Sequence, residues 1–265
     1  MRDYRTPAKS QVLTPPWAGG NGQENNCVMD GAQANWQMTF PDRHCLQRVF
    51  SNGGDIDPWY SPEYIQSFIQ RDTTMEEFRP DIEFSIHGIV HVDISGDMST
   101  TYSCNDILFW LHHSNIDRIW WEWQNVPSAN GTLSNMWKMG GPNYDNTETT
   151  IYTDIVAYNE PISTVMQLGY GMMCYQYTDA FYPVSNIARS ANVSESAYTV
   201  VRDDATLISY VASALRNKKE IPYPARLTPE WIAMHKFNVS DVNHVENDAR
   251  QFVEEMFMAG YKSPI

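Results

Sequence analysis

The sequence lacks long apolar runs and an excess of basic residues. No apolar stretch approaches the roughly 20 residues that a membrane-spanning helix needs, and the first residues lack the apolar core of a secretory signal. Lysine and arginine total 18 against 32 acidic residues, so the formal net charge is -14. This charge would repel a phosphate backbone or an anionic bilayer. We therefore expect no nucleic acid and no membrane as partner, and a soluble protein, secreted or cytoplasmic.

Cysteine is scarce and widely spaced. The sequence has four cysteines and no C-x-x-C pair, namely Cys27, Cys45, Cys104 and Cys174. Their spacing predicts neither a cysteine zinc site nor a dense disulfide framework, and it leaves the redox compartment open. At 265 residues the chain is long enough to bury a substantial core, and one domain is the expectation.

Turn-forming residues dominate the beginning of the sequence. Gly, Pro, Asn and Gln recur through residues 1–57 without a sustained period, which predicts a long irregular segment. Helical signals follow in residues 58–180, the expected core. Residues 181–265 alternate helical signals with breaks and are expected to form a helical C-terminal extension. The predicted fold class is mainly α, with long loops.

Several helices have recognisable beginnings. Ser61 is the expected N-cap of a helix with Pro62 at its first position, and apolar residues follow at helical spacing. A second helix is expected to start at Pro80, and a third covers roughly residues 105–124. Short extended pieces are expected within residues 153–179. The C-terminal extension should contain further helices over residues 203–217, from Thr228 with Pro229 behind it, and over residues 241–258.

Two histidines, His87 and His91, stand four residues apart in the string IEFSIHGIVHVDISGDM. On a helix both imidazoles leave the same face, about 6 Å apart along the axis. That is the spacing that two ligands of one metal need. By itself an H-x-x-x-H pair is a weak signal.

A second pair, His112 and His113, lies in the apolar and aromatic run DILFWLHHSNIDRIWWEWQ. Burial penalises a charged imidazole, whereas a neutral imidazole bound to a cation suits such a place. The alternative is a pair of core histidines bonded to backbone carbonyls, and for His112 that interpretation is equally good. Asp117 lies one turn after His113 and would orient an imidazole or pair with Arg118.

Three histidines from two antiparallel helices suit copper, zinc or iron by ligand type. Glu83 precedes His87 by four residues and is the nearest carboxylate, so an iron site with two histidines and one carboxylate is an alternative. It ranks low, because Glu83, His87 and His91 form one line along a helix and do not comfortably cap one face of an octahedron.

The longer pattern resembles a known family. The strings HGIVH, SGDM and NDILFWLHHSNIDRIWWEWQ are similar to the second copper-binding half, CuB, of tyrosinases, catechol oxidases and molluscan haemocyanins. The upstream strings GGNG, CVMDGAQANW and HCLQRVF resemble the segment that connects the two copper halves of these proteins. The string CYQYTD resembles the tyrosine motif that ends their catalytic core. A composite motif of this length is very specific.

The resemblance implies a ligand set and a missing component. His87, His91 and His113 would be the copper ligands, and His112 would support the pocket beside them. Family members hold a second copper, CuA, with three further histidines upstream, and this sequence is expected to start at about the end of that half. The predicted architecture is thus part of a tyrosinase-like four-helix copper bundle, completed by a CuA-containing chain or segment. The remaining histidines follow no CuA spacing, and these are His44, expected to be structural, His235 and His244.

The resemblance also bears on the substrate. The family commonly has Asn where this chain has Gly88, and that Asn is thought to help deprotonate a monophenol. Gly88 has no side chain to hold a water, and Val92 offers only an apolar wall. Glu83 is the candidate carboxylate base, with Glu76 and Glu77 as less favoured alternatives. Ile107 replaces a usual Pro. We therefore expect oxidation of o-diphenols to o-quinones by dioxygen to exceed hydroxylation of monophenols. The alternatives are haemocyanin-like oxygen binding and a non-catalytic copper-binding remnant.

Overall fold

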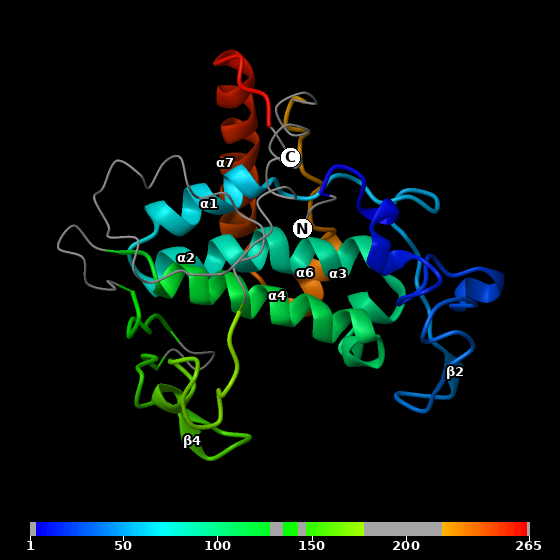
Figure 1. The fold of residues 1–265 in the computed structure, drawn as a ribbon, viewed down its shortest axis with the longest axis horizontal. Coiled ribbons are helices and arrows are strands. Elements are labelled where there is room, and N and C mark those ends of the chain that lie inside the picture. Colours follow the sequence, from blue (N-terminus) through cyan, green and yellow to red (C-terminus); the bar gives the residue numbers. More distant parts are fainter. Residues whose placement is uncertain (1–3, 128–134, 143–146, 178–218, 264–265) are drawn as a thin grey trace, which may run out of the picture. The chain divides into compact units, whose positions relative to one another are not determined.

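The computed structural model describes residues 4–127, 135–142, 147–177 and 219–263. Its regular structure is mostly helical, in agreement with the predicted fold class, and its strands are two-residue pieces (Figure 1). Of these residues, those up to Trp120 and residues 219–263 form one compact unit, and the described residues between Trp121 and Tyr177 form a second. No helix among the described residues is long and apolar enough to cross a membrane.

The first part of the larger unit is largely irregular, with one small antiparallel sheet in which Gln37 pairs with Cys45. A disulfide joins Cys27 to Cys45, with their Cα atoms 5.5 Å apart, whereas Cys104 is free. The short elements of residues 4–60 are η1 (Pro7–Lys9), η2 (Gln11–Leu13), η3 (Glu24–Asn26), β1 (Gln37–Met38) and β2 (His44–Cys45).

Helix α1 (Pro62–Arg71) begins where the sequence predicts. The Ser61 hydroxyl accepts a hydrogen bond from the backbone N–H of Tyr64, and Pro62 occupies the first turn, where its missing N–H costs nothing. The buried face carries apolar residues at helical spacing, namely Tyr64, Ile65, Phe68 and Ile69.

The next helix begins earlier than expected, so the predicted start at Pro80 is wrong. Helix α2 (Met75–Ile82) begins at a capping box, in which Thr74 and Glu77 satisfy each other's backbone N–H groups. Pro80 lies inside the helix, and a π-helical turn, η4 (Glu83–His87), follows directly and leads into α3 (Gly88–Ile94). A π turn absorbs an irregular hydrogen-bond ladder, which fits a helix with an internal proline.

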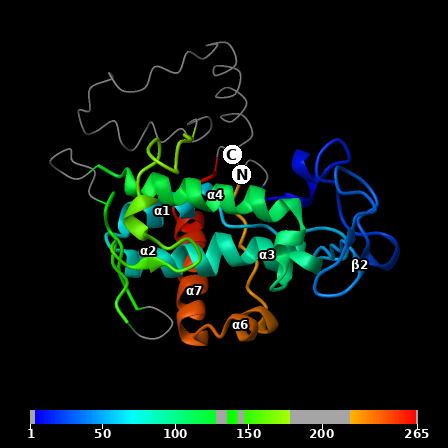
Figure 2. The same cartoon turned by 90° about the horizontal axis from the view of Figure 1, so that it is seen from below.

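Helix α4 (Ile107–Gln124) returns alongside α2 and α3 in the opposite direction (Figures 1 and 2). Two short turns, η5 (Gly96–Ser99) and η6 (Ser103–Asn105), connect it to α3. The N-terminus of α4 is fixed by a fully buried ion pair, because Arg48 donates to both carboxylate oxygens of Asp106, at 2.6 and 2.8 Å. Asp106 also accepts the N–H of Leu108, so it caps the helix as well.

The C-terminal residues of the larger unit form two helices. Thr228 caps α6 (Pro229–His235), as predicted, and Asn238 caps α7 (Val239–Met258). Figures 1 and 2 show α7 running across the α2–α3 helix. One apolar cluster joins these elements, made of Phe84, Val92, Leu227, Trp231, Val242 and Val245. The helix predicted over residues 203–217 lies outside the described residues.

The second unit contains the short extended pieces expected within residues 153–179. Strands β3 (Asp154–Ile155) and β4 (Glu160–Pro161) pair antiparallel, and the short turn η7 (Ile162–Thr164) follows. The last turn of α4 belongs to this unit, and within it the Gln124 side chain donates to the carbonyl of Met166 at 2.9 Å. Cys174 is exposed and free here.

Candidate metal centre

Four histidines converge between α3 and α4. His87 ends the π turn and His91 follows one turn later in α3, while His112 and His113 are adjacent in α4. The centroids of the four imidazoles are separated by 4.9 to 5.6 Å in all six pairs. Antiparallel packing of two helices thus brings the H-x-x-x-H pair and the H-H pair together.

His91 and His113 face each other through their Nε2 atoms, which lie 3.3 Å apart. His91 donates its Nδ1–H to the carbonyl of Met98 at 2.7 Å, so its Nε2 carries a lone pair. Two nitrogens that are each about 2.0 Å from one metal at a tetrahedral angle lie roughly 3.3 Å apart. The pair therefore has the spacing of two ligands of one ion.

His87 is oriented by a carboxylate. Its Nδ1 lies 3.1 Å from Oε1 of Glu83, one helical turn earlier. An imidazole that donates Nδ1–H to a carboxylate has its tautomer fixed and its Nε2 left for a metal, the usual arrangement behind a metal-binding histidine. Glu83 therefore contacts His87 directly and can orient its ring.

His112 is buried, and its Nε2 lies 3.1 Å from the backbone carbonyl of His87. This is the carbonyl bond that sequence reasoning offered as the alternative for His112. One ring nitrogen from each of His87, His91 and His112 can be chosen so that all three lie within 4.8 Å of one another. Both His112 and His113 are thus within reach of an ion bound by His87 and His91.

The site favours neutral imidazoles. Burial, followed by the neighbouring imidazoles, lowers the pKa of His91 to about 3. Burial also lowers the pKa of His113 to about 4 and holds that of His112 well below its usual range. Neutral imidazoles keep the lone pairs that a metal needs. Burial would raise the pKa of Glu83, but its bond to His87 and the nearby imidazoles hold it below the usual value, so Glu83 stays ionised.

Gly88 and Val92 lie on the neighbouring face of the same helix, against α6. A Cβ atom on Gly88 would be 2.8 Å from Cδ2 of Leu227 and 3.2 Å from Nε1 of Trp231. Val92 is buried in the apolar cluster with the same two residues. The side that sequence reasoning regarded as a bare wall is therefore filled by the C-terminal extension. Asp117 lies half-buried in α4, one turn beyond His113.

Sequence reasoning missed the contribution of α6. Trp231 stacks on His91, with ring centroids 5.1 Å apart and planes 23° apart, and His235 packs on Trp231 with centroids at 4.2 Å. No spacing rule relates residues so far apart in the chain. His44 is distant in sequence from the four clustered histidines. Its Nε2 lies 2.9 Å from Oδ2 of Asp97, a contact that suits the structural role expected for it.

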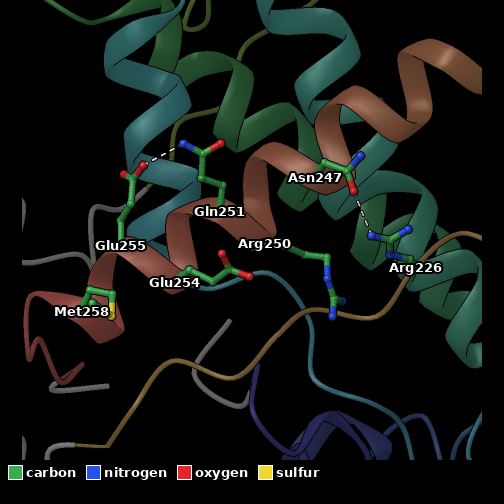
Figure 3. Close-up of a pocket in the computed structure, with 7 residues that line it drawn as sticks. All are labelled: Arg226, Asn247, Arg250, Gln251, Glu254, Glu255 and Met258. Atoms are coloured by element: carbon green, nitrogen blue, oxygen red, sulfur yellow. Dashed lines mark hydrogen bonds between the residues drawn. The ribbon is translucent and has the colours of Figure 1, made fainter.

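A surface groove of about 590 Å³ lies along α7 (Figure 3). It is lined by side chains of both charges, and Arg226 donates to Asn247 at 2.9 Å within it. None of the four clustered histidines lines this groove, so it adds nothing to the metal centre. Its lining residues are Arg226, Asn247, Arg250, Gln251, Glu254, Glu255 and Met258.

The fold and the site define a class: a helical protein in which four histidines from two antiparallel helices meet. Residues 3–126 match the family model described as the common central domain of tyrosinase. Tyrosinase ustQ of Aspergillus flavus is 32% identical over 59% of this chain and 47% of its own length. The tyrosinase-like protein phomQ2 of Diaporthe leptostromiformis is 27% identical over 60% and 45%, and the tyrosinase of Streptomyces lincolnensis 32% over 44% and 49%.

Residues 3–126 are thus similar to the central domain of tyrosinases, and the resemblance to this family is confirmed at the level of the family. The chain spans about half the length of the curated relatives it matches. At the level of the family, this similarity points to copper and to an oxidoreductase. The donor set fits copper, since it offers imidazoles of which three, those of His87, His91 and His112, have a hydrogen-bond acceptor at one ring nitrogen.

Proposed function

We propose that the chain binds one copper ion through His87, His91 and His113 and takes part in the oxidation of o-diphenols to o-quinones by dioxygen. The facing Nε2 atoms of His91 and His113, 3.3 Å apart, are the observation that carries the proposal. When bound, copper supplies one-electron redox chemistry and a place for oxygen. The site then corresponds to the CuB half of a tyrosinase-like four-helix bundle.

His113 is preferred to His112 as third ligand because of what the Nε2 atom of each ring does. The Nε2–H of His112 donates to the backbone carbonyl of His87. This hydrogen bond holds α4 against the helix that carries the other ligands. The Nε2 of His113 instead points at the lone pair of His91. His112 therefore positions the ligand helix, and Asp117 is proposed to support α4 beyond His113.

The residues around the site favour a diphenol. Glu83 is the carboxylate that can accept a phenolic proton, because it remains ionised and lies beside His87. Gly88 and Val92 contribute no polar group, and Leu227 and Trp231 crowd the Gly88 face. A diphenol is more acidic than a monophenol and can bind through two oxygens, so it depends less on a positioned base. Diphenol oxidation is therefore proposed to exceed monophenol hydroxylation.

The proposal includes a second copper half from another chain or segment. Oxidising a catechol to a quinone removes two electrons, and one copper ion accepts only one. The exposed apolar side chains at the start of α4 support such a partner, because Ile107, Trp110 and Leu111 are 37, 61 and 50% exposed within two turns of His113. The opposite side of the bundle is already covered, since α6 and α7 pack over Phe84 and Val92.

The test is a catechol oxidation assay on the copper-loaded chain, alone and with a CuA-containing tyrosinase segment added. We expect quinone absorbance only in the combined sample, and its loss in His113→Ala. His244→Ala, which alters an exposed histidine of α7, is the matched control and should retain activity. Turnover by the chain alone at one copper per chain would contradict the need for a partner. Reversible oxygen binding without quinone in the combined sample would instead favour a haemocyanin-like carrier, and failure to bind copper would leave a non-catalytic remnant.

A further inference from the structure

Helix α6 presents two buried ring nitrogens that have no hydrogen-bond partner among the described residues. They are Nε1 of Trp231, in a side chain only 4% exposed, and Nε2 of His235. Buried polar atoms without partners are rare in folded proteins and call for an explanation such as a bound water. The rings are neighbours, with centroids 4.2 Å apart, so one explanation can serve both.

Trp231 places its N–H group beside the metal centre. The indole stacks on His91, and its Nε1 lies 3.2 Å from the point that a Cβ atom on Gly88 would occupy. A side chain at residue 88 would thus compete with the indole for this place. The glycine allows α6 to approach the helix that carries His87 and His91.

The pKa of His235 responds to burial and to the neighbouring Glu83 and His87. Burial lowers the pKa of His235, the negative charge of Glu83 opposes that shift, and His87 adds to it. A lowered pKa favours the neutral imidazole, and in the tautomer with the proton on Nδ1 its Nε2 is an acceptor. Trp231 then offers a donor and His235 an acceptor.

A donor and an acceptor on adjacent rings are what a single buried water needs, since such waters typically make two to four hydrogen bonds. We propose that Trp231 and His235 of α6 hold one ordered water between their ring nitrogens. The water links the two rings and so fixes the indole that stacks on His91. Trp231 and His235 are then positioning residues of the centre.

The water is tested by NMR on the zinc-loaded chain, in which tryptophan indoles carry 15N. Trp231→Phe keeps an aromatic ring on His91 but removes the N–H, so it identifies the Trp231 signal. We expect a cross-peak from that indole proton to a long-lived water in the wild type. His235→Phe should remove or weaken the cross-peak at least threefold, whereas the same change at exposed His244 should leave it intact. Absence of the cross-peak, or its persistence in His235→Phe, would overturn the water site.

A further readout separates this inference from the proposed function. Metal titration of the same samples tests the copper site: a chain that shows the water but binds no copper refutes the function alone. A chain that binds copper but shows no water refutes only the inference.

Discussion

Replacing Asp106 with Ala should destabilise the protein strongly, because Asp106 neutralises the fully buried guanidinium of Arg48. Removing one partner of a buried ion pair typically costs about 3–5 kcal/mol, since the other charge stays buried without a counterion. Losing the cap on the N–H of Leu108 adds about 1 kcal/mol. Arg48 retains the carbonyls of Ala18 and Gly19, at 3.0 and 2.8 Å, which moderates the loss. We expect a net loss of about 3–5 kcal/mol.

The assay is urea unfolding followed by circular dichroism, with Asp106→Ala compared with Arg48→Ala and with the double variant. Residues in direct contact couple, so the double variant should lose less stability than the sum of the single variants. Asp42→Ala, at an exposed position, is the matched control and should change stability by less than about 0.5 kcal/mol. A loss below about 1 kcal/mol in Asp106→Ala, or strict additivity, would refute the argument that this pair fixes α4.

Three other predictions follow from single features. Burial raises the pKa of Asp93 to about 7, so the stability that its protonation contributes is complete below about pH 4 and is lost as the pH rises through 7. The urea midpoint should therefore fall between about pH 4 and pH 7, level off above pH 7, and fall less in Asp93→Asn. Reducing the disulfide between Cys27 and Cys45 should cost about 3 kcal/mol, measured by unfolding with and without reductant, and no difference would contradict a constraining role. Gly88→Asn should lower the free energy of unfolding by about 1–3 kcal/mol, because the new Cβ would clash with the side chain of Leu227. An unchanged melting curve would show that the segment around α6 shifts to accommodate the side chain without loss of stability.

The helices that could be predicted are those whose ends carry local signals. Ser61 with Pro62 marks α1, and Thr228 with Pro229 marks α6, because capping and a first-turn proline act within a few residues. Pro80 was misleading for the same reason: a proline resembles a helix start, yet the capping box at Thr74 begins α2 upstream. The π turn that follows Pro80 has no local signature in the sequence.

The cluster of four histidines was predictable as far as short motifs in the sequence specify it. The spacing of His87 and His91 and the doublet at His112 and His113 specify which imidazoles meet once two helices pack antiparallel. The contacts of α6 were not predictable, because nothing local relates Trp231 to His91. Such long-range packing is decided by the fit of apolar surfaces. The reason for a glycine at residue 88 therefore became visible only in the structure.

The most direct test of the account is copper binding to the chain and to two neighbouring variants, His113→Ala and His112→Ala, by competition with a chelator of known affinity. The account predicts one copper per chain in the wild type and loss of that copper in His113→Ala. In His112→Ala the affinity should fall by about 10- to 100-fold without being abolished, as for residues that support a ligand. His244→Ala should match the wild type. Retention of copper by His113→Ala together with its loss from His112→Ala would contradict the proposed ligand set.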